Sequence, residues 1–281
     1  MRTFYVSAFV AMILLINGCT VKFAYNQLDW LVPWYVSDYL EMDSKQGAFF
    51  DKRLKDYLDW HRRSQLPQYA SFLRNVAKGV GDGLTEQEVA MYRSQTEKIA
   101  RALVDRLAPD VIALFANATD TQLDALLHSL DDESERLREK SVEVTLQQQR
   151  QERVEDVIGA IERWTGSLTD KQEAQVAAWG VQYQPVEKEF YQSGVAWQAE
   201  FSQVLGMRGD FKPYSARFHR LLTTSDFGWS KTFEEKMQKN KQSLSQLYFD
   251  LDKSFTGKQR RRIIETLNEY ADDFDQLAKQ G

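Results

Sequence analysis

Apolar residues recur at intervals of three and four along most of this chain. That spacing places them on one face of an α-helix, and no stretch shows the strict alternation that is typical of a half-buried strand. The longest series comprises Val176, Trp179, Tyr183, Val186, Phe190, Trp197, Phe201 and Val204. The sequence therefore predicts an all-α protein, folded as an elongated helical bundle over residues 28–281.

The composition narrows the class of protein further. The 281 residues include one cysteine, so no intramolecular disulfide can form and a disulfide-rich scaffold is excluded. Lysine and arginine number 36 against 41 aspartate and glutamate residues, which gives a net charge of −5. Because phosphate binding needs a cationic face, we expect no nucleic-acid partner.

Residues 131–153 depart from the apolar rhythm. Only Leu137, Val142, Val144 and Leu146 are apolar in this stretch, and most of the rest are charged residues or glutamine. Such residues form helices well but offer no face for burial, whereas a flexible linker is richer in glycine, serine and proline. We expect a long polar helix that projects from the body or joins two helical lobes.

Four helix starts share one pattern, in which a threonine is followed three residues later by glutamate or glutamine. This spacing is the capping box, in which the hydroxyl accepts from the third amide of the helix and the third side chain accepts from the capping amide. The four pairs are Thr85 and Glu88, Thr119 and Gln122, Thr169 and Gln172, and Thr256 and Gln259. They predict where helices begin, each with about 1 kcal/mol of local stability.

The N-terminus has the three parts of an export signal: Arg2, an uncharged apolar run over residues 4–16, and a polar end. The run is too short for a membrane span, which takes about 20 helical residues. The segment Ile16-Asn17-Gly18-Cys19 resembles the lipobox of bacterial lipoproteins. The resemblance implies removal of residues 1–18 and attachment of a diacylglycerol and an N-acyl chain to Cys19. The alternative is an ordinary signal peptide with an incidental cysteine.

The resemblance also implies a location. Gram-negative lipoproteins that are retained in the inner membrane typically carry aspartate after the acylated cysteine, whereas this chain has Thr20. We therefore expect a lipid-anchored protein of the bacterial outer membrane that faces the periplasm. Residues 19–27 are expected to be a short tether, which keeps the helical domain over residues 28–281 close to the membrane.

An aromatic segment follows the tether and allows two interpretations. Trp30, Trp34 and Tyr35 could lie in the headgroup region, because their rings combine an apolar body with a polar tip. Alternatively the segment packs into the protein core, with Pro33 near the start of a helix. We favour the core, because charged residues flank the aromatic side chains and buried aromatic residues dominate cores.

Two families share short strings with this chain. The lipobox, residues 28–35 and residues 66–69 look like a family of uncharacterised proteobacterial lipoproteins, a domain of unknown function. That resemblance implies a helical periplasmic lipoprotein. Leu168 to Gln172 also matches the Leu-Thr-x-x-Gln motif of periplasmic chaperones such as Spy and CpxP, although an independent capping box explains this match equally well.

The chain shows no constellation of catalytic or metal-binding residues. His61, His128 and His219 stand apart, and no spacing offers paired ligands, so we expect no metal and no cofactor besides the acyl groups. One cationic run stands at a helix start, where the helix dipole disfavours it: Arg260, Arg261 and Arg262. It is either an anion-binding patch or, as we favour, a set of ion pairs with nearby carboxylates.

Three functions are compatible with these features. We favour a non-enzymatic binding or scaffold protein of the cell envelope, whose partners are the membrane and another envelope protein. The alternatives are a holdase-like chaperone and, third, a cell-wall or lipid hydrolase. A chaperone needs an exposed apolar patch, and a hydrolase needs a cleft with convergent carboxylates.

Overall fold

The computed structural model describes residues 18–141 and 144–280, and within them every regular element is a helix. The all-α prediction is therefore confirmed for the described part of the chain. The helices are α2 (Gly18–Tyr25), α3 (Leu28–Ser37), α4 (Ser44–Trp60), a π-helix η1 (His61–Gln65), α5 (Leu66–Asp82), α6 (Glu86–Ala116), α7 (Asp120–Ser141), α8 (Leu146–Thr165), α9 (Asp170–Gln182), α10 (Glu187–Gly206), α11 (Phe211–Thr223), α12 (Lys231–Ser254) and α13 (Gly257–Ala278).

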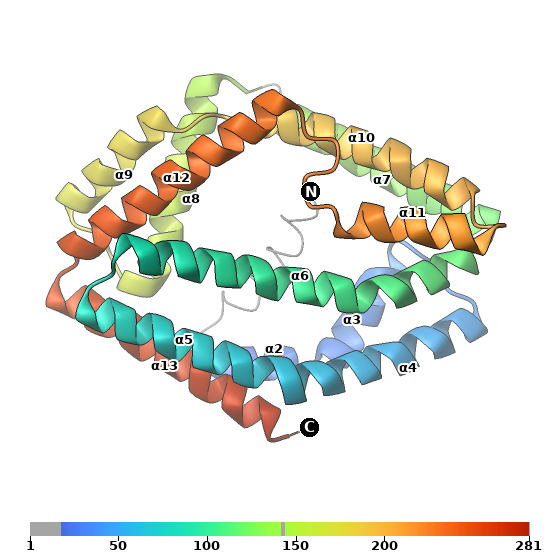
Figure 1. Ribbon diagram of the computed structural model, residues 1–281, viewed down its shortest axis with the longest axis horizontal. Helices are drawn as coiled ribbons and strands as arrows, with labels where there is room; N and C mark the ends of the chain where they lie inside the picture. Colours follow the sequence, from blue (N-terminus) through green and yellow to red (C-terminus); the bar gives the residue numbers. More distant parts are fainter. Residues whose placement is uncertain (1–17, 142–143, 281) are drawn as a thin grey trace.

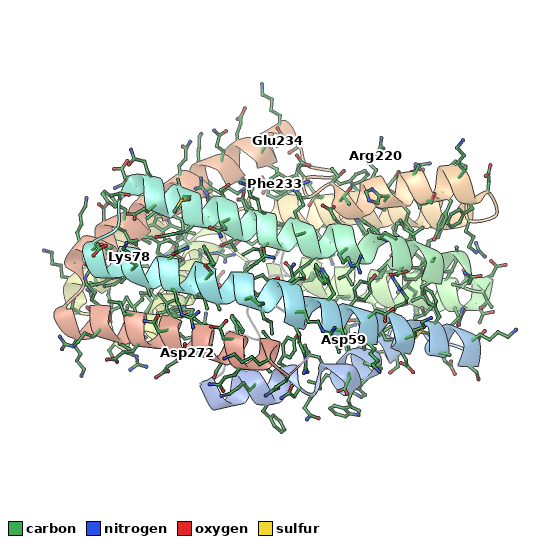
Figure 2. The ribbon with its side chains drawn as sticks, turned by 60° about the horizontal axis from the view of Figure 1, so that its bottom comes forward. Asp59, Lys78, Arg220, Phe233, Glu234 and Asp272 are labelled. Carbon is green, nitrogen blue, oxygen red and sulfur yellow. The ribbon has the colours of Figure 1, made fainter. Side chains whose placement is uncertain are left out.

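The helices form three groups (Figure 1). At one end α8, α9 and α12 pack together, and at the other end α7, α10 and α11 do so, while α6 crosses between the two ends. Along the lower edge α4 is followed by α5, and α13 lies beside α5. Turned forward, this edge carries α2 and α3 as its outermost layer (Figure 2). The bundle is thus elongated, with the N-terminal helices on one edge.

Each end has its own apolar core. Phe201, Tyr214 and Phe218 are buried between α6, α7, α10 and α11, whereas Val176 and Phe233 are buried between α8, α9, α10 and α12. Burial of one large apolar side chain contributes about 1.5–3 kcal/mol, so each core is a substantial source of stability. Helices α7 and α8 lie in different cores, on either side of the junction between them.

The expected long polar helix over residues 131–153 is divided between α7 and α8. Helix α7 ends at Ser141 and α8 begins after Thr145, whose backbone is extended (φ −68°, ψ 154°). The Thr145 hydroxyl accepts from the Gln148 amide, and the Gln148 side chain accepts from the Thr145 amide. A new capping box therefore starts a second helix inside a stretch whose composition favours helix throughout.

The four predicted capping boxes are all present in the structure. Besides the box at Thr145, one more was not predicted, at Asp43 and Gln46, because aspartate stands in place of threonine. Aspartate is an equally good capping residue, so the pattern Asp-x-x-Gln has the same meaning as Thr-x-x-Gln.

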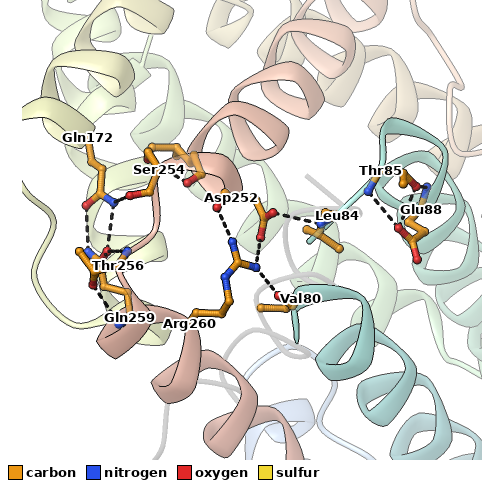
Figure 3. A network of polar contacts seen from close by, with 11 residues as sticks. Val80, Leu84, Thr85, Glu88, Gln172, Asp252, Ser254, Thr256, Gln259 and Arg260 are labelled. Carbon is orange, nitrogen blue, oxygen red and sulfur yellow. Dashed lines mark hydrogen bonds and ion pairs between the residues drawn. The ribbon is translucent and has the colours of Figure 1, made fainter. Parts of the chain in front are cut away.

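Two of these boxes are joined to each other through their glutamines (Figure 3). Gln172 of α9 and Gln259 of α13 exchange two hydrogen bonds of 3.0 and 2.9 Å between their amide groups. Gln172 also donates to the Ser254 carbonyl and Gln259 to the Ser167 carbonyl, both at 3.0 Å. Both glutamines are buried, and the helix starts of α9 and α13 are therefore fixed to one another.

A second glutamine pair repeats this arrangement between α4 and α7. Gln46 and Gln122 exchange hydrogen bonds of 3.1 and 2.8 Å. Gln46 also donates to the Asn117 carbonyl at 2.9 Å, and Gln122 to the Glu41 carbonyl. In both pairs, each glutamine donates to a backbone carbonyl of the partner's segment. That carbonyl lies two residues before the residue that caps the partner's helix. Each pair therefore has local two-fold symmetry.

Candidate membrane-proximal site

The site starts at the N-terminal helix α2. Ile16 and Asn17 of the predicted signal-peptidase recognition sequence lie outside the described residues, whereas Gly18 and Cys19 are the first two residues of α2. The segment predicted as a tether is helical up to Tyr25 and lies against α13.

Two buried side chains hold α2 in this position. Val21 and Tyr25, one turn apart, are 0% and 2% exposed in a core that α2 shares with α5 and α13. The Lys22 ammonium lies 2.9 Å from a carboxylate oxygen of Asp273, which ties the same helix to α13 by charge. The N-terminal helix is therefore an integral part of the fold.

The aromatic segment is exposed. Trp30, Trp34 and Tyr35 of α3 are 61%, 58% and 50% exposed, and Phe23 of α2 is 66% exposed. The core position that we favoured from the sequence is therefore wrong for these three residues of α3. The two tryptophan rings are stacked, with centroids 6.3 Å apart and planes inclined by 11°.

The reason is that only one side of α3 packs into an apolar core. Leu28 and Val32, four residues apart, face the core that α2 shares with α5 and α13. Trp30 follows Leu28 by two residues, and Trp34 follows Val32 by two residues. On a helix this places each tryptophan about half a turn away from the buried side. On that side α3 borders an open groove and not a packed core, so an apolar composition alone did not reveal which aromatic residues are buried.

A groove of about 920 Å³ runs between α3 and α4 beside these tryptophans. It is lined by carboxylates from Asp29 of α3 and from Asp51 and Asp59 of α4, together with Lys55 and Arg62. Figure 2 shows Asp59 where α4 lies next to α3. Within the described residues only Arg62 of these five side chains forms a hydrogen bond, at 2.9 Å to the Asn26 side chain.

A partly buried aromatic cluster lies at one end of the groove. The Tyr25 hydroxyl and His61 Nδ1 share a hydrogen bond of 2.9 Å, and the two rings are stacked. Burial lowers the pKa of His61 to about 4 and raises the pKa of Tyr25 to about 12, so both side chains are neutral at pH 7. The cluster therefore attaches α2 to the π-helix η1 without charge.

The π-helix that carries His61 has a local cause. Pro67, in the first turn of α5, has no N–H and cannot donate to the carbonyl four residues earlier. The backbone widens over His61–Gln65 and then resumes as α5. A π-turn inside a continuous helix is frequent at functional sites, and here it places His61 against α2.

The three arginines at the start of α13 have different surroundings, and Figure 3 shows those of Arg260. The Arg260 guanidinium donates to the Asp252 carboxylate at 2.9 Å, to the Asp252 carbonyl at 2.6 Å and to the Val80 carbonyl. The Asp252 carboxylate also accepts a hydrogen bond of 3.0 Å from the Leu84 amide. Arg260 thus makes the ion pair that we favoured and joins α5, α12 and α13. Arg261 and Arg262 are exposed.

No group of three or more histidine, cysteine, aspartate or glutamate side chains in residues 18–141 and 144–280 is placed to hold a metal ion. Over the same residues, none of the helices combines the length and the apolar character that crossing a bilayer requires.

Comparison with known protein families matches residues 38–234 to a family of unknown function (DUF6279). The match begins after the aromatic segment and ends within the first turn of α12. Searches among curated proteins and among solved structures returned no similar protein.

Proposed function

We propose a function for this chain, which belongs to DUF6279, a family of unknown function: it is an outer-membrane lipoprotein that faces the periplasm and serves as a non-enzymatic scaffold or binding protein. One observation carries the proposal. The exposed aromatic side chains of α2 and α3 follow directly after Cys19, the residue with the sequence context of a lipid anchor.

The geometry of α2 supports a shared membrane contact for the acyl groups and the aromatic residues. Phe23 follows Cys19 by four residues in the sequence, and its side chain is 66% exposed. The opposite face carries Val21 and Tyr25, which are buried. The exposed Phe23 ring would enter the membrane to which acyl chains on Cys19 attach the protein, with the two tryptophans of α3 in the headgroup region.

The scaffold function is supported by the way the helices are held. The two glutamine pairs fix the starts of four helices, and Arg260 joins one of them, the start of α13, to the ends of α5 and α12. Such fixed helices present constant outer faces to a partner. We therefore propose that the end groups, α7 with α10 and α11 and α8 with α9 and α12, contact another envelope protein.

A holdase-like chaperone is a second candidate, because one apolar surface is exposed. Leu146 of α8 and Val181 of α9 are 65% and 73% exposed and flank a shallow groove of about 690 Å³. Suppression of client aggregation at equimolar protein, abolished by Leu146→Ser with Val181→Ser, would favour the chaperone over the scaffold.

Metabolic labelling with radioactive palmitate tests the anchor. We expect label on the wild type and none on Cys19→Ser, and equal label on both proteins would refute the anchor. A second assay tests the non-enzymatic part of the proposal. Turnover of a cell-wall or lipid substrate by the purified protein, lost on substitution of a single groove residue such as Asp59, would overturn it in favour of a hydrolase.

A further inference from the structure

The groove between α3 and α4 carries charges of both signs next to the exposed tryptophans. We infer that it binds the headgroup of a membrane phospholipid that has a primary ammonium group beside its phosphate, the phosphoethanolamine headgroup. The inference rests on the proposed membrane contact of α2 and α3, and it adds a lipid specificity to that contact.

The carboxylates of the groove suit the ammonium end of this headgroup. Asp29 approaches from α3, while Asp51 and Asp59 approach from α4, and none of the three forms a hydrogen bond or ion pair within the described residues. A primary ammonium has three N–H donors, and charge-assisted bonds to carboxylates are among the strong hydrogen bonds. A quaternary ammonium has no N–H donor and cannot make these bonds.

The cations of the groove suit the phosphate end. Lys55 stands between Asp51 and Asp59 on α4, one turn from each, so the charge alternates along the groove. The Arg62 guanidinium lies 5.2 Å from the centroid of the Tyr25 ring, which orients it at one end of the groove. An arginine held in this way offers a planar set of donors to phosphate oxygens.

The balance of charge selects between headgroups. Three carboxylates outnumber two cations, so a headgroup with a phosphate and no amine is repelled more than it is attracted. A zwitterion that presents an ammonium and a phosphate matches both signs. Trp30 and Trp34 line the same groove and are exposed, so the apolar part of the lipid can pass along their rings into the bilayer.

Fluorescence quenching of the mature acylated protein tests this inference. The protein is placed in phosphatidylcholine vesicles that contain an equal, small fraction of one brominated lipid, which is phosphatidylethanolamine, phosphatidylcholine or phosphatidylglycerol. The contribution of α3 is the part of the quenching that disappears in the variant with Trp30→Phe and Trp34→Phe. We expect brominated phosphatidylethanolamine to be enriched at α3 by about tenfold over the other two lipids, the preference given by one charge-assisted hydrogen bond.

Variants of the groove supply the matched comparison. Asp29→Asn with Asp59→Asn should remove the preference, whereas Asp38→Asn, at the exposed end of α3 outside the groove, should retain it. Equal quenching by all three lipids in the wild type would overturn the headgroup specificity and leave the membrane contact in place. Strongest quenching by phosphatidylglycerol would also overturn it. Quenching by none would remove the membrane contact and the specificity together.

Discussion

The glutamine pair between α9 and α13 makes a quantitative prediction about folding stability. The Gln259 side chain bonds to Gln172, to the Ser167 carbonyl and to the Thr256 amide, and it is 5% exposed. At about 1 kcal/mol for each of the three partners, Gln259→Ala should lower the free energy of unfolding by about 3 kcal/mol. Gln172→Ala should have a similar effect, because the arrangement is symmetrical.

The double variant separates the pair from its surroundings. Each single substitution already breaks the hydrogen bonds between the two amide groups. The losses of unfolding free energy of the two single variants should therefore add up to about 1–2 kcal/mol more than the loss of the double variant. Urea denaturation followed by circular dichroism measures all four proteins, with the slope checked for constancy. Gln148→Ala is the control, because its side chain is exposed and caps only its own helix, so about 1 kcal/mol or less should be lost. Effects of Gln172→Ala and Gln259→Ala that add within 0.3 kcal/mol would refute the coupling.

Two further predictions concern pH and packing. The pKa of His61 in the folded protein, about 4, lies below its value of about 6.5 in the unfolded chain, so the unfolded chain binds the proton first and stability falls as the pH drops from 6.5 towards 4. Urea titrations should show that the free energy of unfolding falls by about 2 kcal/mol more for the wild type than for His61→Gln between pH 7.5 and pH 5. Equal decreases for the two proteins would contradict a neutral His61 in the folded protein. A Cβ at Gly180 would collide with Val154 Cγ2, whereas one at Gly159 would meet nothing within 4 Å. Thermal unfolding should show Gly180→Ala destabilised by about 1–3 kcal/mol and Gly159→Ala stabilised by up to about 1 kcal/mol, and the same sign for both would contradict the packing of α8 on α9.

The features that could be predicted from the sequence are local ones. A capping box involves residues three apart, so Thr85, Thr119, Thr169 and Thr256 could be identified as helix starts without knowledge of the fold. The pairing of Gln172 with Gln259 could not be predicted, because it joins residues 87 apart in the chain. Each glutamine looks like an ordinary part of its own capping box.

Burial of the N-terminal segment depended on the same long-range information. The apolar composition of residues 28–36 is compatible with a core position or with a membrane surface, and the choice depends on how many helices cover α3. Val21 and Tyr25 are buried because α13, from the other end of the chain, packs on α2. The position of Arg260 is likewise set by the ends of α5 and α12, which lie elsewhere in the sequence.

Thiol accessibility in membranes tests the central claim most directly, because Cys19 is the only cysteine and acylation blocks its sulfur. Trp34→Cys and Phe211→Cys each introduce one thiol at an exposed position, the first on α3 and the second on α11. We expect a water-soluble maleimide to label position 211 in isolated membranes and to label position 34 only after detergent is added, while the wild type stays unlabelled throughout. Equal labelling of both positions before detergent, or labelling of the wild type, would contradict an acylated protein with the aromatic face of α3 on the bilayer.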